Sequence, residues 1–270
     1  MPDVSFKVGY FQFSPVFGKV RRNHAVILSA LSGVEADLMV LPELPLTGYG
    51  FRNREELLSL AGNPQESEYI SDIARLCGRS GMHVVTGFAE REGTRVFNSA
   101  ILVGPAGIKG VYRKLHLFDR EKLYFDPGDL PLRVYDVNGL RIGMMVCFDW
   151  IFPEVARTLT IAKADVLCHP ANLVLDHCQR AMTVRCTENM VYSITANRTG
   201  TEEHSFGNLS FTGKSQILAP GGDVLKCSNG SSEETALVEI DVSVSRNKFI
   251  TDRNHVLEDR RPEFYRRDGS

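Results

Sequence analysis

A single cysteine, Cys147, stands out in the segment MMVCFDWIFPE at 144–154. It lies where an apolar run ends and an acidic, tryptophan-containing segment begins, whereas a structural cysteine is usually a small hydrophobic residue inside such a run. A thiol with an ordinary pKa of ~8.5 is only a few per cent thiolate at neutral pH, so a catalytic cysteine needs a base or a cation nearby. A chemical role for Cys147 therefore depends on which charged residues the fold brings to it.

Other catalytic and metal-binding patterns are missing from the sequence. The six cysteines form no CxxC pair, and the seven histidines form no HExxH or HxH pattern. His169, His177 and Cys178 lie close together, but their spacing fits no known zinc pattern. Cys147 has no papain-type surroundings, the chain has no GxSxG, and NGSSEE at 229–234 indicates an exposed loop. We expect no metal and no cofactor.

The composition is that of an ordinary globular protein. Of the 270 residues, 43% are hydrophobic and 24% are charged, and the formal net charge of −2 gives no electrostatic reason to expect nucleic acid as a partner. The start, MPDVSFKVGYFQF, lacks the regions of a signal peptide, and no stretch approaches the ~18 apolar residues of a membrane span. We expect a cytoplasmic protein with reduced cysteines and no membrane partner.

The predicted elements follow the same order in both halves of the chain. In the first half the apolar pattern predicts a strand, a helix, a strand, a helix, a strand and a hairpin, at 4–13, 20–34, 36–43, 69–77, 82–88 and 97–114. In the second half it predicts the same order, at 140–147, from Pro153, and at 164–171, 180–190, 191–198 and 214–226. This shared order favours an internal duplication over chance similarity between short strands.

This repeat predicts where two reactive residues meet. Alternating strands and helices predict sheets covered by helices, and the symmetry predicts two sheets facing each other with the helices outside. Glu43 would then end the second strand of one half, and Cys147 the first strand of the other. Because α/β proteins bind ligands at such strand ends, we expect both side chains at one site.

Blocks spread over nearly the whole chain resemble the signature blocks of the nitrilase superfamily, the carbon–nitrogen hydrolases. They are LPELPLTGYG at 41–50, YRKLHLFDREKLYFDPG at 112–128, VCFDWIFPEVARTL at 146–159, RCTENMVYSITANRTG at 185–200 and FTGKSQILAPGGDVL at 211–225. Within the superfamily they are similar to the small nitrilases of hyperthermophilic Pyrococcus species. The resemblance implies an α/β fold, a four-layer αββα sandwich with an internal pseudo-two-fold repeat. It also implies a Glu-Lys-Cys triad, which the blocks place at Glu43, Lys114 and Cys147.

Hydrolysis of a carbon–nitrogen bond needs these residue types. Glu43 can take the thiol proton and return it to the leaving nitrogen, a role worth ~10²–10⁴-fold in rate. Lys114 supplies a cation that favours the thiolate and then faces the oxyanion, with the backbone N–H of Phe148 as a second donor. Water then hydrolyses the thioester. Glu121, seven residues after Lys114, matches a second glutamate of the superfamily that positions lysine and substrate; the alternative for it is an exposed loop residue.

Four residues are candidate substrate contacts. Phe148 and Trp150 follow the nucleophile closely, so they are expected in the wall of the pocket, with the core as the alternative for Trp150. Tyr49 resembles the pocket-lining tyrosines of family amidases. Asn172, at the end of a second-half strand, offers a polar contact for substrate.

Four nearby polar residues are given structural roles. His116 is expected as a hydrogen-bonded core residue that anchors the lysine loop. Asp149 serves the backbone or caps the helix that begins at Pro153. Asp119 and Asp126 are assigned to turns.

The expected activity is that of an amidase releasing a carboxylic acid and ammonia from small, neutral amides. Positions 148–152 hold no Arg or Lys, whereas relatives that bind a substrate carboxylate often place an arginine just after the cysteine. A basic residue that binds a substrate carboxylate would have to come from another part of the chain, and Arg198 is one candidate. A nitrilase acting on small nitriles and an N-carbamoyl amidohydrolase remain alternatives, as does a catalytically silent interaction protein, against which the intact triad argues.

The C-terminal segment suggests self-association. We expect a carbon–nitrogen hydrolase domain at 1–250 and a tail at 251–270 that takes part in the contacts of a homodimer. In a free coil Phe264 and Tyr265 of this tail would be left in water. The expected partners are therefore a small amide or nitrile and a second copy of the chain.

Overall fold

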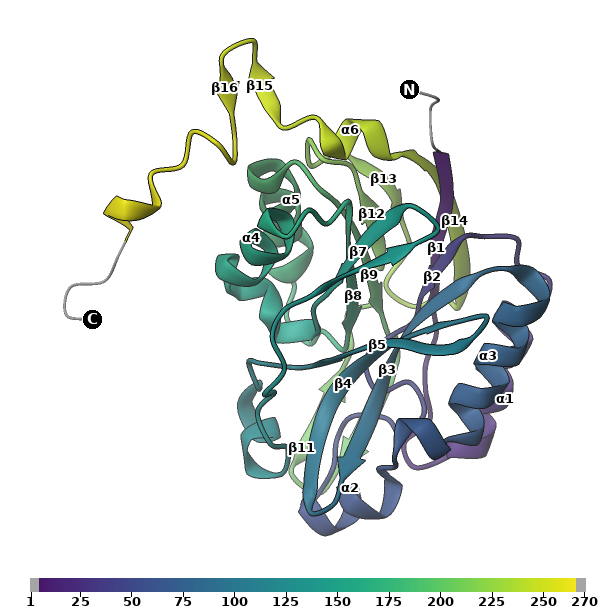
Figure 1. Cartoon of the computed structure of the whole chain (residues 1–270). Helices are drawn as coiled ribbons and strands as arrows, with labels where there is room; N and C mark the ends of the chain where they lie inside the picture. The colour runs from purple at the N-terminus through teal and green to yellow at the C-terminus, as the bar shows by residue number, and fades with distance from the viewer. Residues whose placement is uncertain (1–4, 266–270) are drawn as a thin grey trace.

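Four layers make up the structure, a computed structural model that describes residues 5–265. Two six-stranded sheets lie between two pairs of helices (Figure 1). Helices α1 (Val20–Leu31) and α3 (Glu68–Ser80) lie outside one sheet, and α4 (Pro153–Ile161) and α5 (Cys178–Asn189) outside the other. The predicted αββα sandwich is confirmed.

The twelve strands of the two sheets form two matching sets. The first sheet contains β1 Ser5–Gln12, β2 Leu38–Val40, β3 His83–Glu92, β4 Arg95–Gly104, β5 Gly107–Arg113 and β14 Glu234–Asp241. The second contains β6 Val134–Val137, β7 Leu140–Met144, β8 Val166–Ala171, β9 Tyr192–Asn197, β12 Gln216–Leu218 and β13 Val224–Cys227.

Both sheets have the same topology. The first runs β14-β1-β2-β3-β4-β5, with β1, β2 and β3 parallel and the outer strands antiparallel to their neighbours. Read from its β6 edge, the second runs β6-β7-β8-β9-β12-β13, with β7, β8 and β9 parallel and the outer strands antiparallel. The halves therefore match strand for strand. The repeat in the sequence predicts five of the six strands in each sheet, and the edge strands β14 and β6 were not predicted.

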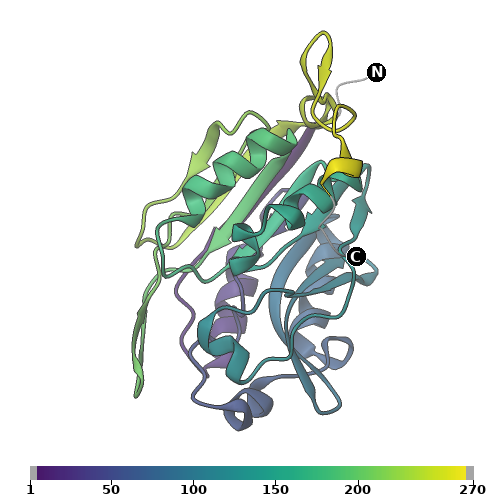
Figure 2. The same cartoon turned by 90° about the vertical axis from the view of Figure 1, so that its left-hand side faces the viewer.

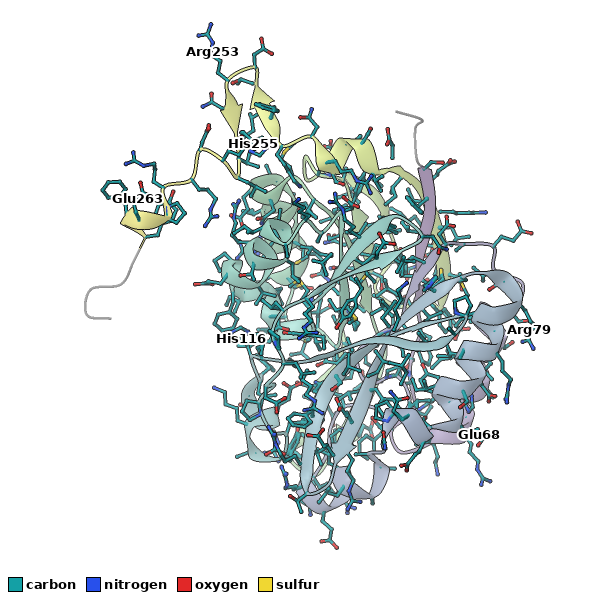
Figure 3. All side chains as sticks on the ribbon, in the orientation of Figure 1. Glu68, Arg79, His116, Arg253, His255 and Glu263 are labelled. Atoms are coloured by element: carbon teal, nitrogen blue, oxygen red, sulfur yellow. The ribbon has the colours of Figure 1, made fainter. Side chains whose placement is uncertain are left out.

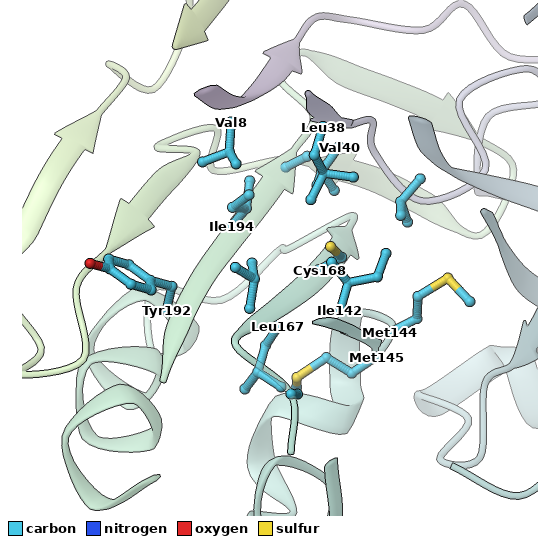
Figure 4. Packing of buried hydrophobic residues seen from close by; sticks show 14 of the residues in the cluster. Val8, Leu38, Val40, Ile142, Met144, Met145, Leu167, Cys168, Tyr192 and Ile194 are labelled. Atoms are coloured by element: carbon cyan, nitrogen blue, oxygen red, sulfur yellow. The ribbon is translucent and has the colours of Figure 1, made fainter. Parts of the chain in front are cut away.

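The main core lies between the two sheets. Val8 and Leu38 of the first sheet belong to one buried cluster with Ile142 and Ile194 of the second (Figure 4). The next residue along β2, Met39, belongs to the cluster beneath α1 and α3 instead, as the alternation of side chains along a strand requires. Because both faces of the central strands are covered, these strands are rich in apolar residues.

Two strands end earlier than predicted. β2 ends at Val40 and β7 at Met144, each three residues before the reactive residue, Glu43 or Cys147. Pro42 has no N–H to donate to a sheet, and Cys147 has a φ of 43°, in the left-handed region that a strand does not use. Both reactive side chains therefore lie on the turns that follow the strands.

Several short elements connect or extend the layers and were not predicted. They are α2 Arg54–Leu60, α6 Val242–Arg246, the 3₁₀ turns η1 Pro64–Glu66, η2 Asp119–Leu123, η3 Cys147–Ile151 and η4 Pro262–Phe264, and the hairpins β10 Thr201–His204 with β11 Gly207–Ser210 and β15 Phe249–Thr251 with β16 Asn254–His255. Among the described residues, none of the helices has the length and apolar character to cross a bilayer.

The C-terminal segment projects away from the sandwich. Arg253, His255 and Glu263 are labelled on it in Figure 3, on the side opposite α3. Viewed from that side of the molecule, α4 and α5 lie next to each other on the outer face (Figure 2). Val4, predicted to begin the first strand, and positions 266–270 of the predicted tail lie outside the described residues.

Candidate active site

Glu43, Lys114 and Glu121 form one buried cluster. Lys114 Nζ donates to Glu43 Oε1 and to Glu121 Oε1, each at 2.8 Å, and all three side chains are fully enclosed. Asn98 Nδ2 donates to the same two oxygens, at 2.6 Å and 3.1 Å. The second Glu43 oxygen, Oε2, is buried and has no hydrogen-bond partner among the described residues. One carboxylate oxygen of Glu43 is therefore fixed and the other is left for chemistry.

Close backbone approaches hold this cluster in place. The loop after β2 carries Glu43 against Gly87 of β3, whose N–H donates to the Pro42 carbonyl at 3.1 Å. A Cβ at position 87 would lie 2.6 Å from the Glu43 Cα, so only glycine allows this approach. On the other side, Gly128 N–H donates to the Lys114 carbonyl at 2.9 Å.

Cys147 occupies a sharp turn between β7 and α4. Its left-handed backbone starts η3. The buried Asp149 stabilises the turn from within, because Oδ2 accepts from the Val146 N–H at 2.8 Å and from the Tyr112 hydroxyl at 2.6 Å. A left-handed backbone conformation is unfavourable for a cysteine, so contacts with the surrounding structure must hold it in place.

The charges on the cluster bear directly on the thiol. Burial raises the pKa of the Cys147 thiol well above its ordinary value, and the Glu43 charge raises it further, outweighing the opposing effect of Lys114. Lys114 thus lowers the pKa of the thiol, the direction expected of a nearby cation, but burial and the Glu43 charge have the larger effect in the unliganded site. Burial opposes the charge of Lys114, yet the carboxylates of Glu121 and Glu43 raise its pKa well above the ordinary value, so it stays a cation.

A small, mostly apolar pocket opens beside Cys147. It is lined by Phe118, Cys147, Phe148, Trp150, Asn172, Leu173, Val174 and Leu175. Three of the candidate substrate contacts are therefore in the lining. Asn172 is 2% exposed, and neither its amide nitrogen nor its amide oxygen has a hydrogen-bond partner within residues 5–265, so both are available to a ligand.

Tyr49 is not among the lining residues. It is buried, with its ring edge-on to Phe211, and its pKa is raised by burial and then by the charges of Glu121 and Glu43. Its hydroxyl thus lies in the field of the carboxylates rather than in the cavity wall.

The structural roles given to nearby residues hold only in part. Asp149 serves the backbone, as predicted, by accepting from the Val146 N–H, and its carboxylate also contacts Tyr112 and His116; it does not cap α4. His116 is hydrogen-bonded, with Nδ1 2.8 Å from Asp149 Oδ1, but its side chain is 31% exposed and stacks on Phe152 rather than lying in the core.

The two turn aspartates and Glu121 are also placed. Asp119 begins η2 with a φ of 43°, whereas Asp126 joins distant segments by accepting from the Val96 N–H and pairing with Arg54. Glu121 is 1% exposed, so the alternative of an exposed loop residue is wrong for it.

Arg198 is committed to an internal ion pair. Its guanidinium pairs with Glu202 and donates to the Pro15 carbonyl at 2.9 Å. Glu202 in turn accepts from the N–H groups of Tyr49 and Gly50 on the loop that follows Glu43. Arg198 is therefore not free to hold a substrate carboxylate.

Sequence reasoning missed three residues that support the site. Asn98 is a polar residue within a predicted strand, His169 contacts the Cys147 backbone, and Glu202 joins the two halves. Of the three, only Asn98 could have been noticed from the sequence, because it is a polar residue inside the largely apolar run 96–103.

Comparison with known proteins agrees with this arrangement. The family model described as carbon-nitrogen hydrolase matches residues 7–248. A protein of Pyrococcus abyssi named nitrilase is 45% identical over 265 residues, covering 96% of this chain and 98% of its own. The N-carbamoylputrescine amidase of Arabidopsis thaliana is 29% identical, covering 86% of this chain and 83% of its own. The crystal structure of a carbon-nitrogen hydrolase from Helicobacter pylori superposes with a TM-score of 0.84 at 23% identity, over 97% of each chain.

Proposed function

Because the chain belongs to the carbon–nitrogen hydrolase family, we propose that it is an amidase that cleaves small, neutral amides through a thioester on Cys147. The observation that carries this proposal is the buried cluster of Glu43, Lys114 and Glu121. It leaves Glu43 Oε2 without a partner among the described residues, and its charges act on the thiol of Cys147, which lines a small pocket. Two carboxylates share one cation there, and such a costly arrangement is typical of catalytic sites.

Acylation begins with the neutral thiol. Because burial and the Glu43 charge hold the pKa of the Cys147 thiol high, the proton leaves during attack, and Glu43 Oε2 is the base that takes it. The sulfur–carbon bond forms as the carbonyl π electrons move to oxygen. Lys114 has a third ammonium proton beyond the two given to the carboxylates, and this proton and the Phe148 N–H stabilise the oxyanion.

Collapse of this intermediate breaks the carbon–nitrogen bond. Glu43 returns its proton to the nitrogen, and ammonia leaves a thioester behind. Water then adds to the thioester while Glu43 again accepts a proton, and the second collapse returns that proton to the Cys147 sulfur and releases the carboxylic acid. No cofactor enters this sequence.

The cavity lining supports a neutral acyl group. It contains aromatic and aliphatic side chains and a single amide, Asn172, with no arginine or lysine among the eight residues. A substrate carboxylate would lose its hydration there without a charged partner, which costs several kcal/mol in an apolar site. Asn172 can instead accept from the N–H₂ group of an amide or donate to its carbonyl.

A nitrilase is the second candidate, favoured by the relative of that name in Pyrococcus abyssi. The same cluster can serve it, but the thioimidate formed from a nitrile must take up a water molecule before ammonia leaves. An N-carbamoyl amidohydrolase remains a third, favoured by the Arabidopsis thaliana relative.

Ammonia release from four compounds of similar length separates these candidates: butyramide, butyronitrile, succinamate and N-carbamoyl-β-alanine. We expect kcat/KM to be highest for butyramide and at least tenfold lower for the two carboxylates, a difference of about 1.4 kcal/mol. A tenfold preference for either carboxylate contradicts the neutral-substrate proposal, and a preference for butyronitrile selects the nitrilase.

We also propose that two chains pair through the outer face of α4 and α5 and the C-terminal segment. Ile161 and Val184 on these helices are 47% and 53% exposed, and Ile250 and Phe264 on the projecting segment are 66% and 70% exposed. Large apolar side chains exposed together on one side of a molecule are typical of interaction sites. A second copy would cover them, as the sequence predicts.

A further inference from the structure

A buried histidine, His169, holds the backbone of the proposed nucleophile. It lies on β8 with no exposed surface, and its Nε2 is 2.9 Å from the carbonyl oxygen of Cys147. Because a carbonyl only accepts, the hydrogen must be on Nε2. Its other nitrogen, Nδ1, is 3.1 Å from Thr195 Oγ1 on the neighbouring strand β9. The Thr195 hydroxyl therefore donates to Nδ1, which selects the tautomer that His169 needs.

The carbonyl of Cys147 and the N–H of Phe148 belong to the same peptide group. In a trans peptide these two groups point in opposite directions, and the described residues contain no cis peptide bond. The carbonyl is drawn toward β8 in the interior, so the Phe148 N–H points away from β8. No acceptor among residues 5–265 pairs with this N–H, and Phe148 lines the cavity beside Cys147.

From this geometry we infer that His169 is a positioning residue that orients the Phe148 N–H as the second oxyanion donor. The inference rests on the proposed function, in which Cys147 forms a tetrahedral intermediate. The left-handed backbone at Cys147 makes such a device necessary, because this conformation is disfavoured for cysteine and the peptide after it would relax without an anchor. His169 does not contribute a proton, since burial lowers its pKa and keeps it neutral.

Two substitutions of His169 by amide residues that differ in side-chain length test this inference. In His169→Gln the side-chain nitrogen extends to about the position of Nε2 and can still donate to the Cys147 carbonyl. In His169→Asn the amide stops near the position of Nδ1 and removes the side-chain donor from that carbonyl. Both variants are polar and neutral, so they differ mainly in the contact under test. Thr195→Val removes the partner that selects the tautomer without touching the nucleophile turn.

Three measurements distinguish orientation of the oxyanion donor from a general effect on the fold. The first is turnover of butyramide, and the second is inhibition by butanal, which forms a tetrahedral thiohemiacetal with Cys147. The third is the rate at which Cys147 reacts with methyl methanethiosulfonate, a reagent without a carbonyl that needs no oxyanion donor. Cys227 is exposed, so all variants carry Cys227→Ser, with the melting temperature of each as a check of folding.

We expect His169→Asn to lower kcat about 10²-fold, the scale of one oxyanion donor, and to weaken butanal inhibition similarly, with little change in KM or thiosulfonate reactivity. His169→Gln should stay within a few-fold of the wild type, and Thr195→Val should fall between them. A folded His169→Asn with full kcat overturns the inference. Equal losses of turnover and thiosulfonate reactivity also overturn it, because His169 would then act on the thiol or the fold. If Cys147→Ala stays active, the proposed function fails instead.

Discussion

Replacing Glu121 with glutamine tests whether the second carboxylate serves Lys114. Its Oε1 accepts from Lys114 Nζ at 2.8 Å and from Asn98 Nδ2 at 3.1 Å, and its Oε2 accepts from the Phe118 N–H at 2.8 Å. Glutamine has the same shape but only one acceptor oxygen and no charge. Its single oxygen can therefore accept either the hydrogen bonds from Lys114 and Asn98 or the one from the Phe118 N–H, but not both sets.

The size of the effect follows from these contacts. A hydrogen bond between charged groups is worth ~1.5–3 kcal/mol, about twice a neutral one, so the neutral amide gives up roughly 1–1.5 kcal/mol at Lys114. If this contact holds Lys114 in the transition state, kcat/KM falls about tenfold. With both carboxylates ionised, the buried cluster of Glu43, Glu121 and Lys114 carries a net charge of −1, which becomes 0 in the variant. The melting temperature should therefore not fall, since a buried net charge is unfavourable.

The dependence of activity on pH gives a second readout. Burial raises the pKa of Glu121 to about 7. The positive charge of Lys114 opposes this rise, and the negative charge of Glu43 adds to it. The deprotonated form is the one that holds Lys114, so kcat/KM of the wild type should fall as the pH is lowered through about 7. Glu121→Gln has no proton to gain at this position and should lose that part of the profile.

The assay is butyramide hydrolysis between pH 5 and pH 9, with Glu90→Gln as the matched control. Glu90 is also buried and paired, to Arg113 Nη2 at 2.5 Å, but it does not contact Lys114. We expect this control to lower the melting temperature and to leave the acid side of the profile in place. Wild-type kcat/KM in Glu121→Gln, with an unchanged acid side, would refute the role given to Glu121.

Three further outcomes are expected. Cys147→Ala should lose turnover yet melt near the wild-type temperature, and intact-mass measurement of Glu43→Gln with butyramide should reveal an acyl adduct on Cys147; turnover by Cys147→Ala would exclude the thioester route. Removal of the residues after Ile250 should weaken a dimer seen by light scattering, whereas a monomeric, active full-length chain would contradict the proposed pairing. Burial raises the pKa of Cys77 to about 12, so the stability that its neutral thiol contributes is complete below ~8.5 and is lost as the pH rises above that value. Urea unfolding at pH 8 and pH 10 should therefore show a smaller loss for Cys77→Val than for the wild type, and equal losses would contradict this.

The layered fold and its repeat could be predicted because they depend on local apolar pattern. The central strands of both sheets are covered on both faces, so each is a short segment rich in apolar residues. The order of these segments, with the helices between them, sets the topology. Glu43 and Cys147 were placed at one site by the same reasoning, and Lys114 and Glu121 by the likeness of their sequence blocks to a known family. Short elements such as β6 and the β10–β11 hairpin lack such a run, and they were missed.

Only the tertiary structure decided how the site is supported and charged. Asn98, His169 and Glu202 contact residues that lie 22 or more positions away in the sequence, and no spacing pattern encodes such contacts. The thiol of Cys147 was expected to be favoured as a thiolate by Lys114, but its pKa depends on how completely the fold removes water and on a carboxylate from the other half of the chain. Sequence determines which groups are present, whereas burial and distance determine their charge, because the cost of removing an ion from water depends on everything that surrounds it.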